Sequence, residues 1–217
     1  MTLMSFIRKI MNILEFKNHM AHYPVFSLQE LKKVFKDFSY RQLDRWEKKG
    51  YLKKVKRGFY VLSERQMDQN LLFYTANKIY PPSYVSLQTA LKFYGLIPEE
   101  IFQVTSVTTK KTTHFEAGMG NFIYGHLKAS LYWGYVFVDY GIQKILMAEP
   151  EKAILDYLYL NPHLKTRDDF AEMRINVDEF RARVSEEKFN HYLKNFESKS
   201  LTKRAQLFLK TMQHDFT

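Results

Sequence analysis

Four positively charged side chains lie within five positions of the segment 50–62: Lys53, Lys54, Lys56 and Arg57. Aliphatic and aromatic residues flank them, and Gly58 follows directly. Because glycine adopts positive φ without steric cost, Arg57-Gly58 is typical of the tip of a β-hairpin. Cations this close repel one another unless an anion is near, and phosphates beside a nucleic-acid groove are such anions, bound with release of condensed counterions. The segment therefore predicts a basic hairpin that contacts nucleic acid.

The preceding segment, residues 39–49, predicts a helix with one apolar and one basic face. At about 100° per residue, Leu43 and Trp46 fall on one side, with Tyr40 at its margin. The opposite side carries Arg41, Arg45, Lys48 and Lys49, with Gln42 at its edge. Arginine can bind guanine bidentately, and glutamine can bind adenine in the same way. A solvated helix face is the alternative. The predicted DNA-contacting residues are Ser39, Tyr40, Arg41, Gln42, Arg45, Lys48, Lys49, Lys53, Lys54, Lys56 and Arg57.

Two capping-box patterns define the helices that position these residues. Ser27 is followed three positions later by Glu30, and Ser39 by Gln42, so both serines predict helix starts. The second helix is expected to stop at Gly50. A further helix is predicted over residues 4–19 from apolar residues at Met4, Ile7, Met11 and Leu14. Two short helices followed by a basic hairpin predict a winged helix-turn-helix.

Carboxylates and a lysine near residue 150 invite comparison with metal-dependent nucleases. In those enzymes an Asp and a Glu hold the metal, and a Lys two residues after the Glu steadies the attacking water. Here Asp139 and Glu149 are present, but Lys152 follows Glu151 directly, and Pro150 favours a helix start over a strand. A nuclease is therefore the least favoured interpretation. We expect Glu151 and Lys152 to cap and solvate the helix, or to contact a partner.

Other side chains capable of chemistry lack suitable neighbours in the sequence. His19 and His22 stand three positions apart without a third metal ligand, while His114, His126 and Ser130 form no pattern of a nucleophilic triad. The run GMGNF lacks the spacing of a phosphate-binding loop. Several aromatic residues could stack on bases, although strand spacing favours sheet packing or a protein interface. These are Tyr132, Trp133, Tyr135 and Tyr140. We expect no catalytic residues, cofactor or metal.

The positive charge is concentrated at the N-terminal end of the chain. Of 33 Lys/Arg and 23 Asp/Glu, residues 1–62 hold 14 and 5, and residues 63–217 hold 19 and 18. This asymmetry indicates a polyanionic partner for the first segment, with a solubilising basic surface as the alternative. An apolar content of 46% excludes a disordered protein, and the chain has no cysteine. It shows no membrane-length apolar run and no signal-peptide pattern, so we expect a cytoplasmic protein.

The polar run 63–70 predicts a linker between a DNA-binding domain, residues 1–62, and a larger domain, residues 71–217. In the larger domain, helices are predicted within 71–80, 86–95 and 149–160, and over about 185–196 and 200–212. Strands are predicted within 101–111, 121–127, 132–141 and 143–148 from their β-branched and aromatic residues. The expected fold class is α+β, with a mixed α/β C-terminal domain.

Four blocks in this order are similar to a known family: LDRWEKKGYLKKVKRGFYVL, PPSYVSLQTALKFYGLIPEE, VTSVTTKKTTHFEAGMGNFIY and AEPEKAILDYLYL. The chain resembles the AbiE antitoxins, the transcriptional-regulator half of the abortive-infection (type IV) toxin–antitoxin systems that defend bacteria against phage. The match covers about residues 39–160. The first block is common among regulators, whereas the second and fourth are more specific.

The resemblance implies an N-terminal winged helix that binds double-stranded operator DNA and represses its own operon. It also implies a C-terminal domain that neutralises a nucleotidyltransferase-like toxin, with or without a direct complex. We therefore expect a non-enzymatic DNA-binding antitoxin that acts away from membranes, and a dimer on DNA is compatible with this. The alternative is a repressor without a toxin partner, whose C-terminal domain dimerises or senses a ligand.

Overall fold

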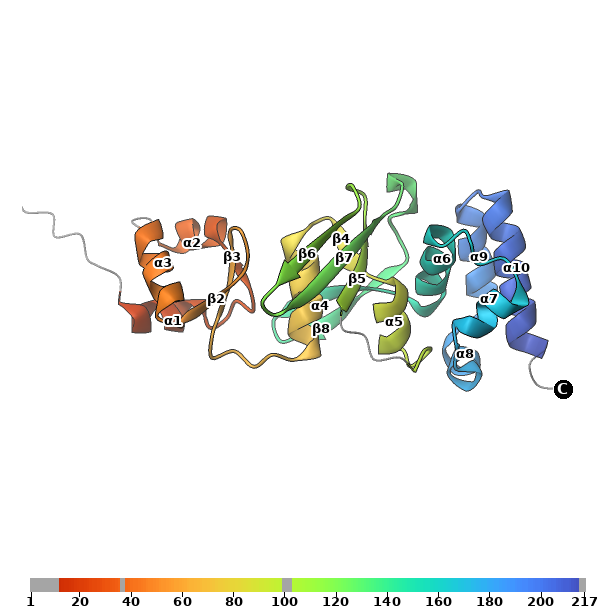
Figure 1. Cartoon of the computed structure of the whole chain (residues 1–217), viewed down its shortest axis with the longest axis horizontal. Helices are drawn as coiled ribbons and strands as arrows, with labels where there is room; N and C mark the ends of the chain where they lie inside the picture. The colour runs from red at the N-terminus through yellow and green to blue at the C-terminus, as the bar shows by residue number, and fades with distance from the viewer. Residues whose placement is uncertain (1–11, 36–37, 99–102, 215–217) are drawn as a thin grey trace, which may run out of the picture. The chain divides into compact units, whose positions relative to one another are not determined.

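The computed structural model describes residues 12–35, 38–98 and 103–214 and has the expected mixed α+β composition (Figure 1). The described residues contain ten α-helices and two β-sheets, and the chain divides into two compact units. The first comprises Met1–Leu71 with Ala117–Met119, and the second comprises Leu72–Glu116 with Gly120–Thr217. No helix in the described ranges is both long enough and apolar enough to cross a membrane.

In the first unit, the described residues up to Leu62 form three helices and a three-stranded antiparallel sheet. Its elements are α1 (Ile13–Met20), β1 (Phe26–Ser27), α2 (Leu28–Val34), α3 (Tyr40–Lys48), β2 (Leu52–Lys56) and β3 (Phe59–Leu62). The strand order is β1-β3-β2, so β3 is central. One apolar core joins helices to sheet and contains Phe16, Met20, Phe26, Leu31, Leu43, Trp46, Leu52, Tyr60 and Leu62. Every element of this unit therefore contributes to a single core.

The helix starts in this unit differ in how they are capped. At α2 the predicted capping box is present: the Ser27 backbone N–H donates to Glu30 Oε2 at 2.8 Å, and the Glu30 N–H donates to Ser27 Oγ at 3.2 Å. At α3, Ser39 is the N-cap, but its side chain makes no capping bond, so the second predicted capping box is wrong. The predicted N-terminal helix is described only from Ile13, and its residues Met4, Ile7 and Met11 lie outside the described ranges.

The segment predicted as a linker is partly attached to the first unit. Residues 63–68 form neither helix nor strand, and α4 (Gln69–Ile79) begins within the predicted linker. Glu64 pairs with Lys17, and the Arg65 guanidinium donates to the Ala21 carbonyl. These contacts hold residues 64 and 65 against α1 and its C-terminal end.

The second unit is built on a six-stranded mixed sheet of order β6-β7-β5-β4-β9-β8. Its strands are β4 (Ser83–Val85), β5 (Gln103–Thr108), β6 (Thr113–Ala117), β7 (Gly120–His126), β8 (Tyr135–Tyr140) and β9 (Gln143–Ala148). β4 pairs antiparallel with β5 and parallel with β9, while β5 and β7 are parallel. The short β4 was not predicted, because residues 81–85 stand between two predicted helices and were assigned to no element. It lies near the centre of the sheet, where its three residues are all buried.

Helices α5 (Leu87–Phe93) and α6 (Pro150–Leu160) pack on each other. The C-terminal helices are α7 (Arg167–Glu172), α8 (Val177–Arg183), α9 (Glu186–Asn195) and α10 (Lys199–His214), of which α9 and α10 contact α6. Figure 1 shows this blue group beyond α6, away from the β6–β7 hairpin. The predicted helices over 185–196 and 200–212 correspond to α9 and α10. The six- and seven-residue helices α7 and α8 were not predicted.

Candidate nucleic-acid interface

Helix α3 is fixed to the first unit by its two predicted apolar anchors. Leu43 is 1% exposed and Trp46 is 6% exposed, and the Trp46 and Phe16 rings lie 4.6 Å apart between centroids. The helix ends in a Schellman motif, in which the Tyr51 and Gly50 N–H groups donate to the Trp46 and Glu47 carbonyls. Gly50 adopts a φ of +72°, which explains why a glycine stands there. Both the rotation and the end of α3 are thereby set by the sequence.

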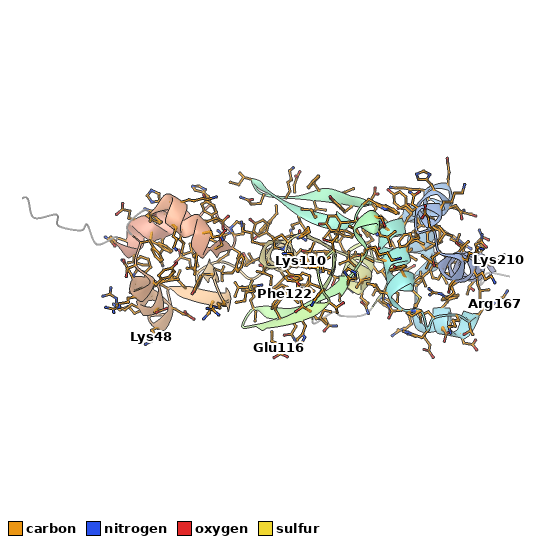
Figure 2. The ribbon with its side chains drawn as sticks, turned by 90° about the horizontal axis from the view of Figure 1, so that it is seen from above. Lys48, Lys110, Glu116, Phe122, Arg167 and Lys210 are labelled. Carbon is orange, nitrogen blue, oxygen red and sulfur yellow. The ribbon has the colours of Figure 1, made fainter. Side chains whose placement is uncertain are left out.

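The predicted basic side chains of α3 are exposed. They are Arg41, Arg45, Lys48 and Lys49, the last being the C-cap. Figure 2 shows Lys48 on the outside of the first unit, with its side chain directed away from the ribbon. Ser39 and Tyr40 are exposed as well, and the Lys32 ammonium lies over the Tyr40 ring at 5.1 Å. Lys32 of α2 therefore adds a further positive charge next to the start of α3.

Gln42 does not lie on this exposed surface, although the sequence placed it at the edge of the basic face. Its side chain is only 8% exposed and lies on the buried side of α3 with Leu43 and Trp46. On a helical wheel Gln42 and Trp46 are separated by only about 40°. Because the Trp46 indole is broad and buried, the buried face of α3 extends as far as Gln42. The prediction placed Gln42 by its distance from Leu43 and neglected the width that Trp46 gives to the inner face.

The β2–β3 hairpin has the predicted tip at Arg57-Gly58, where Gly58 adopts a φ of +86°. A β-bulge between Lys54 and Lys56 shifts the register with β3. An extra residue in one strand moves later side chains to the other face. Leu52 and Val55 can therefore both be buried, while Lys53 and Lys54 are both exposed. This bulge explains the imperfect alternation of the sequence.

The end of the hairpin carries two cations in different surroundings. Arg57 is exposed at the tip, whereas Lys56 is half-buried with its ammonium 5.5 Å from the centre of the Phe59 ring. Phe59 is itself half-buried, and the central strand contributes the buried side chains of Tyr60, Val61 and Leu62. Lys56 is consequently less available to a partner than Arg57.

Seven exposed cations of α3 and the hairpin make no ion pair with any residue of the described ranges. They are Arg41, Arg45, Lys48, Lys49, Lys53, Lys54 and Arg57. By contrast, Lys17, elsewhere in this unit, is paired with Glu64. A surface that concentrates like charges without acidic partners attracts a polyanion and is sensitive to salt. The positive charge identified in the sequence is thus concentrated on α3 and the adjacent hairpin.

A second group of charged residues lies inside the second unit, on β4 and α6. The Asp156 carboxylate is fully buried and accepts hydrogen bonds from the Lys152 ammonium, Tyr84 Oη at 2.9 Å and Ser86 Oγ at 2.9 Å. The Lys152 ammonium also donates to Tyr84 Oη at 2.8 Å. Burial raises the pKa of Asp156 and lowers that of Lys152, while the attraction between the two charges opposes both shifts. We call these four residues the buried polar cluster.

The expectation that Glu151 and Lys152 are solvated or available to a partner is wrong. Glu151 is 2% exposed, and its Oε1 accepts the Ser185 N–H at 2.8 Å. Lys152 is fully buried, with its ammonium 4.8 Å from the Trp133 ring centroid and 5.0 Å from that of Phe196. The sequence pattern showed the helix start at Pro150 but not that Trp133 and Phe196, at the C-terminal end of α9, pack over Lys152. The buried polar cluster is closed to substrate and joins the SYVSL and PEKAILD segments.

The carboxylates considered for a nuclease are not brought together. Asp139 is exposed and pairs with Lys144, whereas Glu149 pairs with Lys188 at 2.6 Å and accepts a hydrogen bond from Tyr192. No group of three His, Asp or Glu side chains within the described ranges is arranged to hold a metal ion. Tyr132, Trp133, Tyr135 and Tyr140 all pack against other aromatic rings of this unit. Their predicted packing role agrees with these contacts.

The second unit also has a shallow hollow of about 670 Å³ at the ends of β5 and β7, lined by Tyr80, Thr109, Lys110, Lys111, Thr112 and His126. The Lys110 ammonium lies 5.3 Å from the Tyr80 ring centroid. Because this hollow is shallow and open to solvent, it gives little support to the ligand-sensing alternative.

No protein-family model and no curated protein matches the sequence. The functional interpretation consequently depends on the residues and on their geometry.

Proposed function

We propose that the protein is a DNA-binding repressor of the antitoxin type. Its first unit would bind double-stranded operator DNA as a winged helix-turn-helix, with α2 and α3 as the helix pair, α3 as the recognition helix and β2–β3 as the wing. Its second unit would neutralise a nucleotidyltransferase-like toxin without catalysing a reaction. The observation that carries the DNA-binding part is the set of seven exposed cations on α3 and the hairpin, none of which forms an ion pair with another described residue.

The arrangement of α3 supports a role in reading base edges. A recognition helix needs a buried stripe that fixes its rotation and an outer face with long polar side chains. Leu43 and Trp46 supply the stripe, and Arg41 and Arg45, four residues apart, occupy neighbouring positions on the exposed face. Because arginine can donate two parallel hydrogen bonds to guanine, these two residues are the proposed base-reading side chains.

The hairpin is suited to phosphate contacts because its exposed cations surround a tight tip. Lys53 and Lys54 are exposed together because of the bulge, and Arg57 lies at the turn. Each phosphate neutralised on B-DNA contributes about −0.9 to the slope of log K against log salt concentration. If Lys54 and Arg57 each neutralise one phosphate, their joint removal reduces the slope by about 1.8.

DNA binding is tested by fluorescence anisotropy with the full chain and a labelled duplex from upstream of its own gene. The double variant Lys54→Ala/Arg57→Ala is expected to bind every duplex more weakly and with the reduced salt slope. Lys210→Ala is the matched control, because it removes an exposed lysine of α10 (Figure 2). Equal salt slopes for wild type, double variant and control would contradict the assignment of the hairpin to phosphates.

The antitoxin part of the proposal is supported by the resemblance of residues 39–160 to the AbiE family and by the near balance of charge after residue 62. If neutralisation uses the second unit, it survives loss of DNA binding. We expect the variant Arg41→Ala/Arg45→Ala/Lys54→Ala/Arg57→Ala to fold, because all four side chains are exposed. It should fail to repress and still rescue cells that express the neighbouring toxin gene. Loss of rescue by the folded variant would tie neutralisation to the basic surface.

The alternative is a repressor without a toxin partner, whose second unit dimerises. One observation favours self-association of this unit: an exposed apolar strand at the edge of the large sheet, described below. The rescue experiment distinguishes the two functions, because a repressor without a toxin partner would not rescue cells that express the neighbouring gene.

A further inference from the structure

Strand β8 forms one edge of the six-stranded sheet and has β9 as its only neighbour in the sheet among the described residues. The two strands pair without a bulge from Tyr135↔Ala148 to Tyr140↔Gln143. In a regular strand, alternate backbone N–H and C=O groups point to the outer side. β8 therefore presents a straight row of backbone donors and acceptors that another strand can pair with.

The side chains of β8 are unusually apolar for an edge. Phe137 is 65% exposed and Val136 is 37% exposed, and at the turn that joins β8 to β9 Ile142 is 79% exposed. Soluble proteins usually protect edge strands with lysine, proline, a bulge or inward-pointing charge. β8 contains no lysine or proline, and its only charged residue, Asp139, is paired with Lys144 of β9. The edge lacks these protective features.

The opposite edge of the same sheet shows the expected protection. β6 carries His114 and Glu116 as exposed side chains, and Figure 2 shows Glu116 directed outward while Phe122 of β7 lies inside the unit. The two edges of one sheet thus differ in their solvent-facing chemistry. An apolar row confined to one edge marks that edge as a protein-pairing surface.

We propose that β8 pairs antiparallel with β8 of a second copy of this chain, about a two-fold axis at Phe137. A two-fold axis perpendicular to the sheet keeps each side chain on the same face of the sheet. Paired residues must therefore lie an even number of positions apart in the sequence, so one residue at the axis pairs with the same residue of the second copy. With the axis at Phe137, the two phenyl rings are direct cross-strand neighbours, Val136 faces Val138, and Asp139 faces Tyr135. Aromatic and β-branched cross-strand pairs are among those that stabilise antiparallel sheets.

The charges fit this register better than the neighbouring one. With the axis at Phe137, the two Asp139 carboxylates lie at opposite ends of the pairing, about 14 Å apart at about 3.4 Å per residue. That exceeds the Debye length of about 8 Å at physiological salt, so their repulsion is weak. An axis at Val138 would instead place Phe137 opposite Asp139. Residues 63–217 contain 19 basic and 18 acidic residues, so two second units do not repel through net charge. The proposal does not depend on DNA binding.

The proposal is tested by analytical ultracentrifugation of the full chain across the micromolar range. Wild type is expected to form a dimer. Phe137→Lys is expected to be monomeric, because two ammonium groups would face each other across the two-fold axis. The matched control is Leu14→Lys in α1: Leu14 is 66% exposed, close to the 65% of Phe137, so the same change is made off the strand. Circular dichroism and thermal melting establish that each variant is folded.

A charge-complementation experiment identifies the pairing residue itself. Phe137→Glu is also expected to be monomeric, while an equimolar mixture of Phe137→Lys and Phe137→Glu is expected to regain a dimer, since opposite charges then face each other. Four outcomes overturn the proposal: a monomeric wild type, a Phe137→Lys variant that dimerises like wild type, a Leu14→Lys control that becomes monomeric, or a mixture that stays monomeric. A monomeric wild type that instead acquires a strand from another protein also overturns the choice of a second copy.

Discussion

The substitution Asp156→Ala is expected to destabilise the second unit by about 3–5 kcal/mol, the usual cost of leaving one member of a buried ion pair without its partner. The Asp156 and Lys152 side chains are both fully buried, so water cannot replace the lost contact. The hydroxyls of Tyr84 and Ser86 lose their acceptor at the same time. A typical domain has only about 5–15 kcal/mol of stability, so this loss is a large part of the total.

The control is Asp139→Ala, which removes the same residue type from a lysine pair on the surface. The side chains of Asp139 and Lys144 are 75% and 56% exposed, so water screens their attraction and the expected cost is under about 1 kcal/mol. The two substitutions thus compare the loss of a buried Asp–Lys ion pair with the loss of an exposed one. A cost for Asp156→Ala no greater than that for Asp139→Ala would refute the reasoning.

The free energy of unfolding is measured in urea at pH 7, with Trp133 fluorescence as the signal. Trp46 and Trp133 lie in different units, so the background substitution Trp46→Phe leaves a reporter in the second unit alone. The fitted m-value must stay constant, because a changed slope means a changed native or denatured state.

The difference in unfolding free energy between wild type and Asp156→Ala should depend on pH because of Lys152. Burial lowers its pKa below the ordinary 10.5, and the loss of Asp156 removes the attraction that opposes this shift. Where a folded-state pKa lies below the unfolded value, the unfolded state binds more protons between the two, and stability rises with pH in that window. The deficit of Asp156→Ala relative to wild type should therefore shrink as pH rises toward 10.5. A deficit that is constant or grows between pH 7 and 10 would contradict this.

Three further outcomes are expected. Arg45→Ala should cost about 1–3 kcal/mol of operator binding and relax sequence preference, whereas Gln42→Ala should lower stability with little change in sequence preference, as seen by anisotropy on matched and mismatched duplexes. Ser27→Ala should lower the unfolding free energy of the first unit by about 1 kcal/mol through loss of its capping bond. Ser39→Ala should cost less, and equal costs would contradict this. Gly134→Ala should be more destabilising than Gly141→Ala in thermal melts, because both glycines have positive φ but only at Gly134 would a Cβ lie 2.9 Å from Lys152 Cγ.

Three features of the first unit were predicted correctly because their signals are local. The Ser27 capping box, the Gly50 stop and the Arg57-Gly58 tip each depend on residues within a few positions of one another, and all three are present. Gln42 was misplaced because its burial depends on the size of Trp46, which a wheel of equal residues ignores. The exposure of both Lys53 and Lys54 depends on a bulge, which periodicity alone does not reveal.

The second unit was predicted less completely because its organisation depends on distant contacts. β4 is three residues long, too short for a periodic signal, and is stabilised by strands on both sides. The positions of Lys152 and Asp156 on one side of a helix are visible in the sequence. Their burial depends on Tyr84 and Ser86, about seventy positions earlier, and on Phe196, more than forty positions later. A charged pair four residues apart on a helix is usually on the surface, so the sequence favoured the wrong environment.

Because Lys152 is buried, the rate at which its amine is chemically labelled reports how often the second unit opens. An amine-reactive reagent modifies exposed lysines such as Lys144 at once, but it reaches the Lys152 nitrogen only when α6 separates from Trp133, Tyr84 and Phe196. The rate at which the Lys152 peptide gains label, followed by mass spectrometry, therefore reports how often the interior of the second unit opens under native conditions. A partner that binds this unit should slow that labelling while leaving the labelling of lysines outside its footprint unchanged. The labelling rate of the buried Lys152 amine thus measures how much of the second unit is bound by a partner.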